Sequence, residues 1–231
     1  MFLLGFLLIT YFRASVHSVD VAVNLWIPSI QSGTLTFFAE AIAVIFGTTS
    51  LVIMSLAISA VLYLKNYRMH ALLFLVAMGG DAVLVSAVKT LDHVARPING
   101  ILFDTSFSYP SGHSAGCIVF GGLLAYFAWR HWKSTRSRAL IGVGMGAVAG
   151  VVGFDRVYLN VHWLSDVLGG WLLGAFWLSF IILVFQQLRR SGGLEPGRFS
   201  LAFKLLFAVA FVVAVFVVLI GLFGNIFSFS F

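Results

Sequence analysis

The sequence predicts an all-α protein built as a polytopic bundle of transmembrane helices. Hydrophobic residues make up 61% of the 231 positions, and charged residues make up only 10%. The mean hydropathy is +1.04. Soluble domains average about 45–50% apolar and about 25% charged residues, so most of this chain is expected to face lipid or other helices. The single cysteine, Cys117, excludes an intrachain disulfide and a zinc cluster.

Long apolar segments mark the expected membrane spans, because a helix needs about 20 apolar residues to cross a bilayer. The clear candidates are Phe37–Leu64, Met69–Val88, Ser114–Trp129, Ala139–Val152, Leu164–Leu188 and Leu205–Ile226. The shorter apolar segment Met1–Phe12 is a further candidate, and it lacks the basic start and cleavage site of a signal peptide. We therefore expect a core at residues 1–190, a cytoplasmic linker at 191–204 and a C-terminal helix within 205–231.

Basic residues concentrate in the connections that this division places on one side of the membrane. They are Lys65, Arg68, Arg130, Lys133, Arg136, Arg138, Arg189, Arg190, Arg198 and Lys204. The positive-inside rule makes that side cytoplasmic. The remaining connections, Ser15–Thr36, Thr90–His113 and Gly153–Trp163, are then expected to be loops that face outward. Their own basic residues need a different explanation.

The first outward cluster runs from Lys89, at the end of a predicted span, to Arg96 and Pro97. Taken alone, Lys89 is explained by an ammonium group that reaches up to the lipid headgroups. Arg96 is then an ordinary loop charge.

The second cluster is YPSGHSAG, at Tyr109–Gly116, directly before an apolar run. Pro110 fits the start of a helix, Ser111 can cap it and Gly112 allows a ligand to approach the backbone. Free N–H groups and the helix dipole make such a start an anion site, with His113 in the first turn. A plain helix cap with a surface histidine explains the same residues equally well.

The third cluster runs from Asp155 to Asp166. His162 and Asp166 are four residues apart, so on a helix they share one face. The carboxylate can accept a hydrogen bond from one imidazole nitrogen, which orients the ring and leaves the other nitrogen free as a nucleophile. A simple surface pair is the alternative.

Taken together, the clusters place two histidines, a carboxylate and three cations on the outward side. The cations Lys89, Arg96 and Arg156 match the charge of a reacting phosphate, and arginine can donate twice to one phosphate group.

The motifs K-x6-R-P at Lys89–Pro97, P-S-G-H at Pro110–His113 and R-x5-H-x3-D at Arg156–Asp166 resemble the three signatures of the type 2 phosphatidic acid phosphatase superfamily. This superfamily includes membrane lipid phosphatases, glucose-6-phosphatase and soluble vanadium haloperoxidases. The resemblance in helix pattern covers Ser15–Leu188 and implies a six-helix phosphatase core. The additional C-terminal helix expected at Leu205–Ile226 lies beyond this pattern, and the resemblance implies no role for it. Asp155 stands where the family usually has serine, so we place it outside the expected phosphate site.

The resemblance implies metal-independent hydrolysis of a phosphomonoester or diphosphate on a lipid. His162, oriented by Asp166, attacks phosphorus to form a phosphohistidine, and His113 gives a proton to the leaving group. The groups expected to hold the phosphate oxygens are Lys89, Arg96, Arg156 and the backbone of Ser111 and Gly112.

The expected partner is a lipid phosphate in the bilayer, with no cofactor, no metal ion, no nucleic acid and no recognisable protein partner. Undecaprenyl diphosphate, phosphatidylglycerol phosphate, phosphatidic acid and lipid A phosphate are the candidate substrates. A bacterial inner membrane with the site facing the periplasm is the expected location. Two alternatives stay open: a phosphotransferase that passes the phosphate to another lipid or a sugar, and a non-catalytic lipid-binding or transport protein.

Three further expectations concern residues to which the resemblance assigns no role. Asp81, inside a predicted span, is expected to pair with a cation of the bundle. Asp92 and Asp104 are expected to be solvated loop residues. The glycines Gly142, Gly146 and Gly150 recur every four residues, which is typical of close helix packing.

Overall fold

The computed structural model describes residues 1–190, and the predicted linker and C-terminal helix lie outside the described residues. Within residues 1–190 the regular structure is helical and includes no strand, which confirms the all-α prediction. The elements are α1 (Phe2–Tyr11), α2 (Arg13–Trp26), the 3-10 helix η1 (Ile27–Ile30), α3 (Gly33–Ile45), α4 (Thr48–Leu64), α5 (Arg68–Asp92), α6 (Gly112–His131), α7 (Thr135–Tyr158) and α8 (Leu164–Arg190).

Four of these helices, α5 to α8, are each long and apolar enough to cross a membrane. Two bent pairs could each form one more span: α1 with the segment Arg13–Ile30, bent by 79°, and α3 with α4, bent by 46°. Counting each pair as one span gives up to 6 spans in the described part of the chain, which agrees with the expected six-helix core.

The span predicted at Phe37–Leu64 corresponds to the bent pair of α3 and α4, and the sequence analysis did not predict the bend between them. Gly47 stands at this bend with extended backbone angles. A Cβ atom there would lie 2.9 Å from the carbonyl oxygen of Ala43, so a larger residue would force the bend to shift. The local conformation therefore depends on glycine, a signal that hydropathy alone does not carry.

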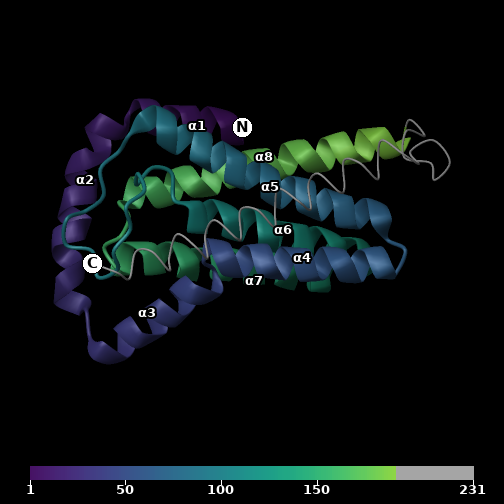
Figure 1. Cartoon of the computed structure of the whole chain (residues 1–231), viewed down its shortest axis with the longest axis horizontal. Coiled ribbons are helices and arrows are strands. Elements are labelled where there is room, and N and C mark those ends of the chain that lie inside the picture. The colour runs from purple at the N-terminus through teal and green to yellow at the C-terminus, as the bar shows by residue number, and fades with distance from the viewer. Residues whose placement is uncertain (191–231) are drawn as a thin grey trace.

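The segment Ser15–Thr36, expected to be an outward loop, instead contains most of α2, all of η1 and the start of α3. α2 mixes polar and apolar residues, so it does not resemble a membrane span, yet its apolar residues recur at helical spacing. Figure 1 shows α2 lying across the end of the bundle at which the long 93–111 connection also lies.

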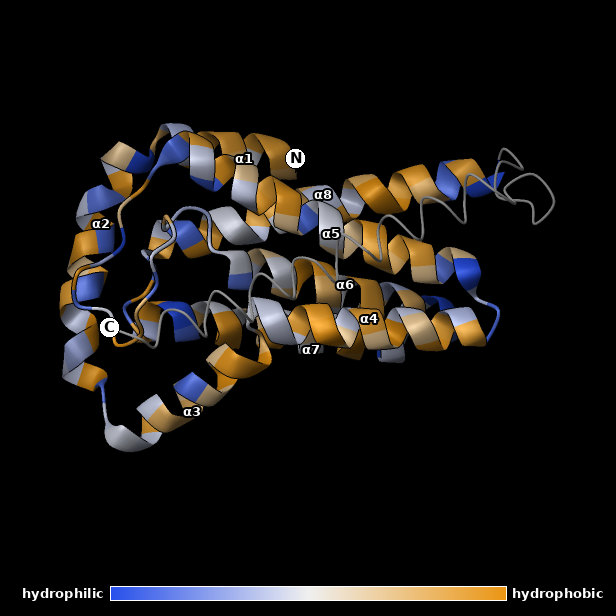
Figure 2. Cartoon of the chain, in the orientation of Figure 1, coloured by the Kyte–Doolittle hydropathy of each residue, from blue (hydrophilic) through white to orange (hydrophobic). Residues whose placement is uncertain are grey.

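α6 is the central helix, and it packs against α4, α5, α7 and α8 (Figure 1). The largest apolar cluster joins α4, α5, α6 and α8 along the middle of the bundle, with Phe74 and Leu123 fully buried in it. Figure 2 shows the hydrophobic colour concentrated along these long helices and hydrophilic colour at their ends. The middle of α6 is thus held by apolar packing against its neighbouring helices.

Close packing through glycine occurs on α8 and not where the sequence pattern on α7 suggested it. No atom of the described residues lies within 4 Å of a Cβ built at Gly142, Gly146 or Gly150. A Cβ built at Gly170 of α8 would instead lie 2.5 Å from the carbonyl oxygen of Ser111, and one at Gly174 would lie 2.7 Å from that of Ala115. The expected close contact therefore joins α8 to the start of α6.

Asp81 does not pair with a cation among the described residues, contrary to expectation. It is 4% exposed, and its Oδ1 atom has no hydrogen-bond partner there. A Cβ built at Gly116 would lie 3.7 Å from Asp81 Oδ2, so the carboxyl group faces α6 about one helical turn below His113.

Candidate active site

The start of α6 has the form that the sequence predicts. Ser111 is the N-cap, and its Oγ accepts hydrogen bonds from the Ser114 backbone N–H at 3.4 Å and from the Ser114 hydroxyl at 3.1 Å. The Ser111 N–H donates to the backbone carbonyl of Asp166 at 3.0 Å. The P-S-G-H motif is therefore joined directly to the third motif at the start of α8.

Lys89 lies in the last turn of α5 and is turned toward the second motif. Its ammonium group donates to the carbonyl oxygens of Phe107 and of Ser108, the latter at 3.3 Å. The 93–111 connection therefore folds back over the end of the helix that precedes it. The Ser108 backbone N–H fixes this fold by donating to the carbonyl of Val94 at 2.8 Å.

Arg96 is the centre of a dense set of contacts. Its Nε donates to the Ser106 carbonyl at 2.8 Å, and one terminal nitrogen donates to Asp104 at 2.6 Å and to the Ser106 hydroxyl at 2.9 Å. The other terminal nitrogen donates to the Val161 carbonyl at 2.6 Å and lies 3.2 Å from His162 Nε2. A guanidinium has five N–H donors, so each one has a protein partner here.

Asp104 is an exposed loop residue, as the sequence led us to expect, but its carboxylate is also paired with Arg96. Burial by itself would raise its pKa, but the Arg96 charge and the hydrogen bonds from Ser106 outweigh burial and hold the pKa below its usual value. Asp92 is also paired, with Arg13 of α2 at 2.8 Å. Asp104 thus holds the 93–111 connection together from within, and Asp92 ties the end of α5 to the start of α2.

Arg156 lies in the last turn of α7, so the expected Gly153–Trp163 loop begins later than predicted. Asp155 and Arg156 are both buried, and two nitrogens of the guanidinium donate to Asp155 Oδ2, one of them at 2.8 Å. Asp155 thus pairs with the cation beside it, which agrees with its placement outside the phosphate site. α7 ends at Tyr158, and Asn160, two residues further on, has a positive φ of 54°, which suits an asparagine.

His162 and Asp166 meet, although they do not share a helical face as the sequence analysis assumed. α8 begins at Leu164, so His162 precedes it and Asp166 lies in its first turn. Asp166 Oδ2 accepts from the Trp163 backbone N–H at 2.9 Å and lies 3.2 Å from His162 Nδ1. This reach of a first-turn carboxylate back to the residue before the helix is half of a capping box.

His162 is 4% exposed. Burial, and then the charges of Arg96, Lys89 and Arg156, lower the pKa of its imidazole well below the usual value of 6.5. All three predicted cations therefore act on this one ring. A neutral imidazole at ordinary pH is the form that can act as a nucleophile.

His113, the predicted proton donor, lies close enough to Arg156 and His162 to experience their charges. Its ring lies against the backbone of Ala43, and its Nε2 is 3.8 Å from the position of a Cβ built at Gly47. The bend between α3 and α4 therefore forms one wall beside His113.

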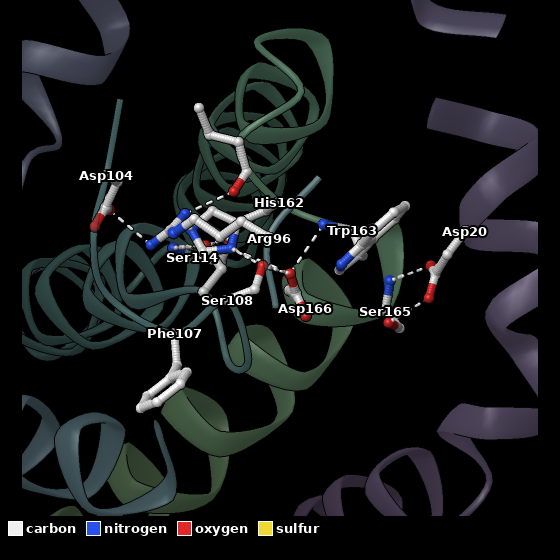
Figure 3. A network of polar contacts seen from close by, with 12 residues as sticks. Asp20, Arg96, Asp104, Phe107, Ser108, Ser114, His162, Trp163, Ser165 and Asp166 are labelled. Carbon is white, nitrogen blue, oxygen red and sulfur yellow. Dashed lines mark hydrogen bonds and ion pairs between the residues drawn. The ribbon is translucent and has the colours of Figure 1, made fainter. Parts of the chain in front are cut away.

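Sequence reasoning missed two side chains that hold the site together. The Ser108 hydroxyl donates to Asp166 Oδ2 and lies 3.3 Å from His162 Nδ1. Asp20 of α2 accepts from the Ser165 backbone N–H at 2.9 Å and from its hydroxyl at 2.6 Å. Figure 3 shows Ser108, His162 and Asp166 turned toward one another, with Asp104 reaching Arg96 and Asp20 reaching Ser165. Neither residue belongs to a motif, so no local pattern marked them.

The donor set does not resemble a metal centre. Within residues 1–190, no three His, Cys, Asp or Glu side chains come together in a way that could hold a metal ion. The cations and helix start instead form a site of positive potential, which suits an anion with several oxygens.

Comparison with known proteins gives one consistent family. The sequence profile of the PAP2 superfamily matches residues 70–190, more than half of the chain. Phosphatidylglycerophosphatase B of Bacillus subtilis is 29% identical over 175 residues, which cover 75% of this chain and 86% of that protein. An undecaprenyl-diphosphatase of Sulfolobus acidocaldarius is 40% identical over 77 residues, covering 33% of this chain and 32% of the relative.

The fold is also similar to a solved structure. The crystal structure of a transmembrane PAP2 type phosphatidylglycerolphosphate phosphatase from Bacillus subtilis superposes with a TM-score of 0.74 at 26% identity. The match covers 85% of this chain and 97% of that one. Because the profile match, the similar sequences and the shared fold agree, this chain belongs to the PAP2 superfamily and is an integral membrane phosphatase.

Proposed function

We propose that this protein hydrolyses the terminal phosphate of a lipid phosphomonoester or diphosphate at the outer face of the membrane, through a phosphohistidine on His162. The observation that carries the proposal is the setting of His162. Its Nδ1 lies 3.2 Å from a carboxylate, and its Nε2 points to the guanidinium of Arg96 at 3.2 Å. A nucleophile thus stands directly beside a phosphate-binding cation.

In the first step His162 Nε2 attacks phosphorus, and the bond from phosphorus to the leaving oxygen breaks. Arg96 donates to Nε2 in the free site, so the incoming phosphate takes over this donor. His113 gives its proton to the leaving oxygen, a contribution commonly worth about 10²–10⁴-fold in rate. Asp166 stabilises the positive charge that develops on the imidazole.

In the second step water attacks the phosphohistidine. His113, now neutral, takes a proton from the water, and the bond between phosphorus and Nε2 breaks to release inorganic phosphate. Lys89, Arg156 and the N–H groups at the start of α6 bind the phosphate oxygens in both steps, and they stabilise the charge that builds up in each transition state.

The arrangement of the bundle supports a lipid substrate and an outward site. Lys89, His113 and Asp166 lie in terminal turns of apolar helices, so a lipid can keep its tail in the bilayer while its phosphate enters. The basic residues Lys65, Arg68, Arg130, Arg189 and Arg190 lie at the opposite helix ends, which the positive-inside rule assigns to the cytoplasm. In a bacterium the site would then face the periplasm from the inner membrane.

The names of the relatives narrow the substrates to test first, namely phosphatidylglycerol phosphate and undecaprenyl diphosphate. The long match to the Bacillus subtilis phosphatase favours the first of these. The test is phosphate release from both lipids, and from phosphatidic acid, by purified protein in detergent with EDTA.

We expect release that persists in EDTA and that is lost in a His162→Ala variant. The control variant is His131→Ala, which changes a histidine at the opposite end of α6. Release that requires an added divalent cation would contradict the proposal. Consumption of the lipid without free phosphate, together with a newly phosphorylated acceptor, would show a phosphotransferase instead.

A further inference from the structure

Ser108 lies at the meeting point of the three motifs. It is fully buried, and no part of the mechanism above uses its side chain. Its hydroxyl donates to Asp166 Oδ2, and its oxygen lies 3.3 Å from His162 Nδ1 (Figure 3). The residue therefore contacts both members of the pair that the proposed nucleophile depends on.

The hydrogen bonds around His162 specify where its ring proton resides. Arg96 has no acceptor atom, so the close contact with His162 Nε2 requires Nε2 to be the unprotonated nitrogen. Nδ1 must then carry the proton, and it has two acceptors within reach, Asp166 Oδ2 at 3.2 Å and Ser108 Oγ at 3.3 Å.

The hydroxyl of Ser108 is suited to this second position. A serine has one proton to donate and two lone pairs to accept with. Because its proton is committed to Asp166, the oxygen presents a lone pair to Nδ1. The same bond restrains the Asp166 carboxylate, whose Oδ2 also accepts from the Trp163 N–H.

We propose that Ser108 is a positioning residue which, together with Asp166, keeps His162 in the tautomer that leaves Nε2 free to attack phosphorus. It touches no reacting atom and acts through His162 and Asp166. The inference rests on the proposed role of His162 as nucleophile.

The first test compares Ser108→Ala with Ser55→Ala. Ser55 is also buried, but it lies on α4, and its hydroxyl donates only to the Leu51 carbonyl at 2.5 Å. We expect Ser108→Ala to lower kcat roughly ten- to a hundredfold, the scale of a small misplacement of a reacting group. KM should stay within about twofold because the phosphate ligands are unchanged. Ser55→Ala should leave kcat unchanged.

The pH profile distinguishes positioning from a general loss of structure. Without the Ser108 bond, the Asp166 carboxylate has one donor fewer and stabilises the charged imidazole more strongly. The acid limb of kcat/KM should therefore move to higher pH in Ser108→Ala, whereas a merely structural defect would lower the rate equally at every pH.

A second measurement uses the unaltered protein, so it holds even if Ser108→Ala does not fold. Nitrogen NMR of the protein with labelled histidine reports which ring nitrogen carries the proton, and the His162 signal is assigned by its loss in His162→Gln. We expect the proton on Nδ1 in the unaltered protein and a mixture of tautomers in Ser108→Ala. A proton on Nε2 of the unaltered protein would overturn the inference.

Failure of this inference is distinct from failure of the proposed function. If Ser108→Ala keeps the wild-type kcat and pH profile while His162→Ala is inactive, Ser108 has no positioning role and His162 is still the nucleophile. If His162→Ala is active as well as Ser108→Ala, His162 is not the nucleophile and the proposed function fails.

Discussion

At the scale of single residues, the chemistry of this site depends on the pKa of His162. Burial and the charges of Arg96, Lys89 and Arg156 all lower the pKa, so the ring keeps its neutral form in acid where an ordinary histidine is charged. The neutral ring is the reactive one. The pH at which activity falls on the acid side should therefore lie below the usual pKa of a histidine.

We predict that kcat/KM keeps its value as the pH falls through 6.5 and declines only at lower pH, since the His162 pKa lies below 6.5. The measurement is a pH profile with two lipid substrates whose phosphates titrate differently, which separates the enzyme from the substrate. An acid limb at or above pH 6.5 with both substrates would contradict the account.

A second prediction at this scale concerns Asp104. Its carboxylate is paired with Arg96, one of the cations proposed to bind the phosphate. Asp104→Asn keeps an acceptor for Arg96 and removes the competing charge. Inhibition by inorganic phosphate should become about fivefold tighter, the equivalent of one exposed charge interaction of about 1 kcal/mol.

The control for this prediction is Asp92→Asn, which alters the pair with Arg13. It should leave phosphate inhibition unchanged. Weaker inhibition in Asp104→Asn would show that the carboxylate helps to build the phosphate site and does not compete for it.

At the scale of elements, α2 stabilises the start of α8 from a distance of 145 residues in sequence. Trp163, before the first helical residue, has no side-chain acceptor for the free N–H groups of the first turn. Asp20 supplies that acceptor to Ser165, the neighbour of Asp166. The α2 segment, which the sequence analysis expected to be an outward loop, thus helps to position Asp166, a proposed catalytic residue.

Asp20→Ala should lower the free energy of unfolding by about 1–3 kcal/mol, because it leaves a buried N–H and a buried hydroxyl without partners. Asp92→Ala, which removes a partly exposed ion pair, should cost only about 0.2–1 kcal/mol. Thermal unfolding of both variants in one detergent measures the difference. Equal losses would mean that Asp20 contributes no more than a surface charge.

The contact between α6 and α8 gives a matched pair of glycine substitutions. Gly170→Ala places a Cβ 2.5 Å from the Ser111 carbonyl, so the helices must separate and the bond from Ser111 to Asp166 is disturbed. We expect kcat to fall by roughly a hundredfold, as for a shift of about 1 Å near the reacting groups. Gly146→Ala, which meets no described atom within 4 Å, should keep full activity. Equal activity in both would contradict this account of the packing.

At the scale of the whole molecule, the sequence predicts the spans and motifs well because both are local patterns. Hydropathy locates α5 to α8, and three short motifs locate Lys89, Arg96, His113, Arg156 and His162. The structure brings these residues together because α5, α6, α7 and α8 all end or begin on the same side.

What the sequence did not predict depends on contacts between distant residues. Ser108 and Asp20 bond partners 58 and 145 residues away, and neither contact leaves a periodic signal. The bend between α3 and α4 falls at the short break Gly47–Ser50 in a longer apolar segment, which hydropathy averaged over a span does not reveal. The pattern Gly142, Gly146 and Gly150 is regular, but periodicity alone does not show whether another helix covers that face.

The central claim, that His162 carries the phosphate, is tested most directly by trapping the intermediate. The protein is mixed with a lipid phosphate labelled in its phosphate group, denatured in alkali within milliseconds and digested, and the labelled peptide is identified. We predict acid-labile label on the peptide that contains His162, and none in His162→Ala. Label on another residue, or rapid turnover with no label on the protein at any time, would contradict the account.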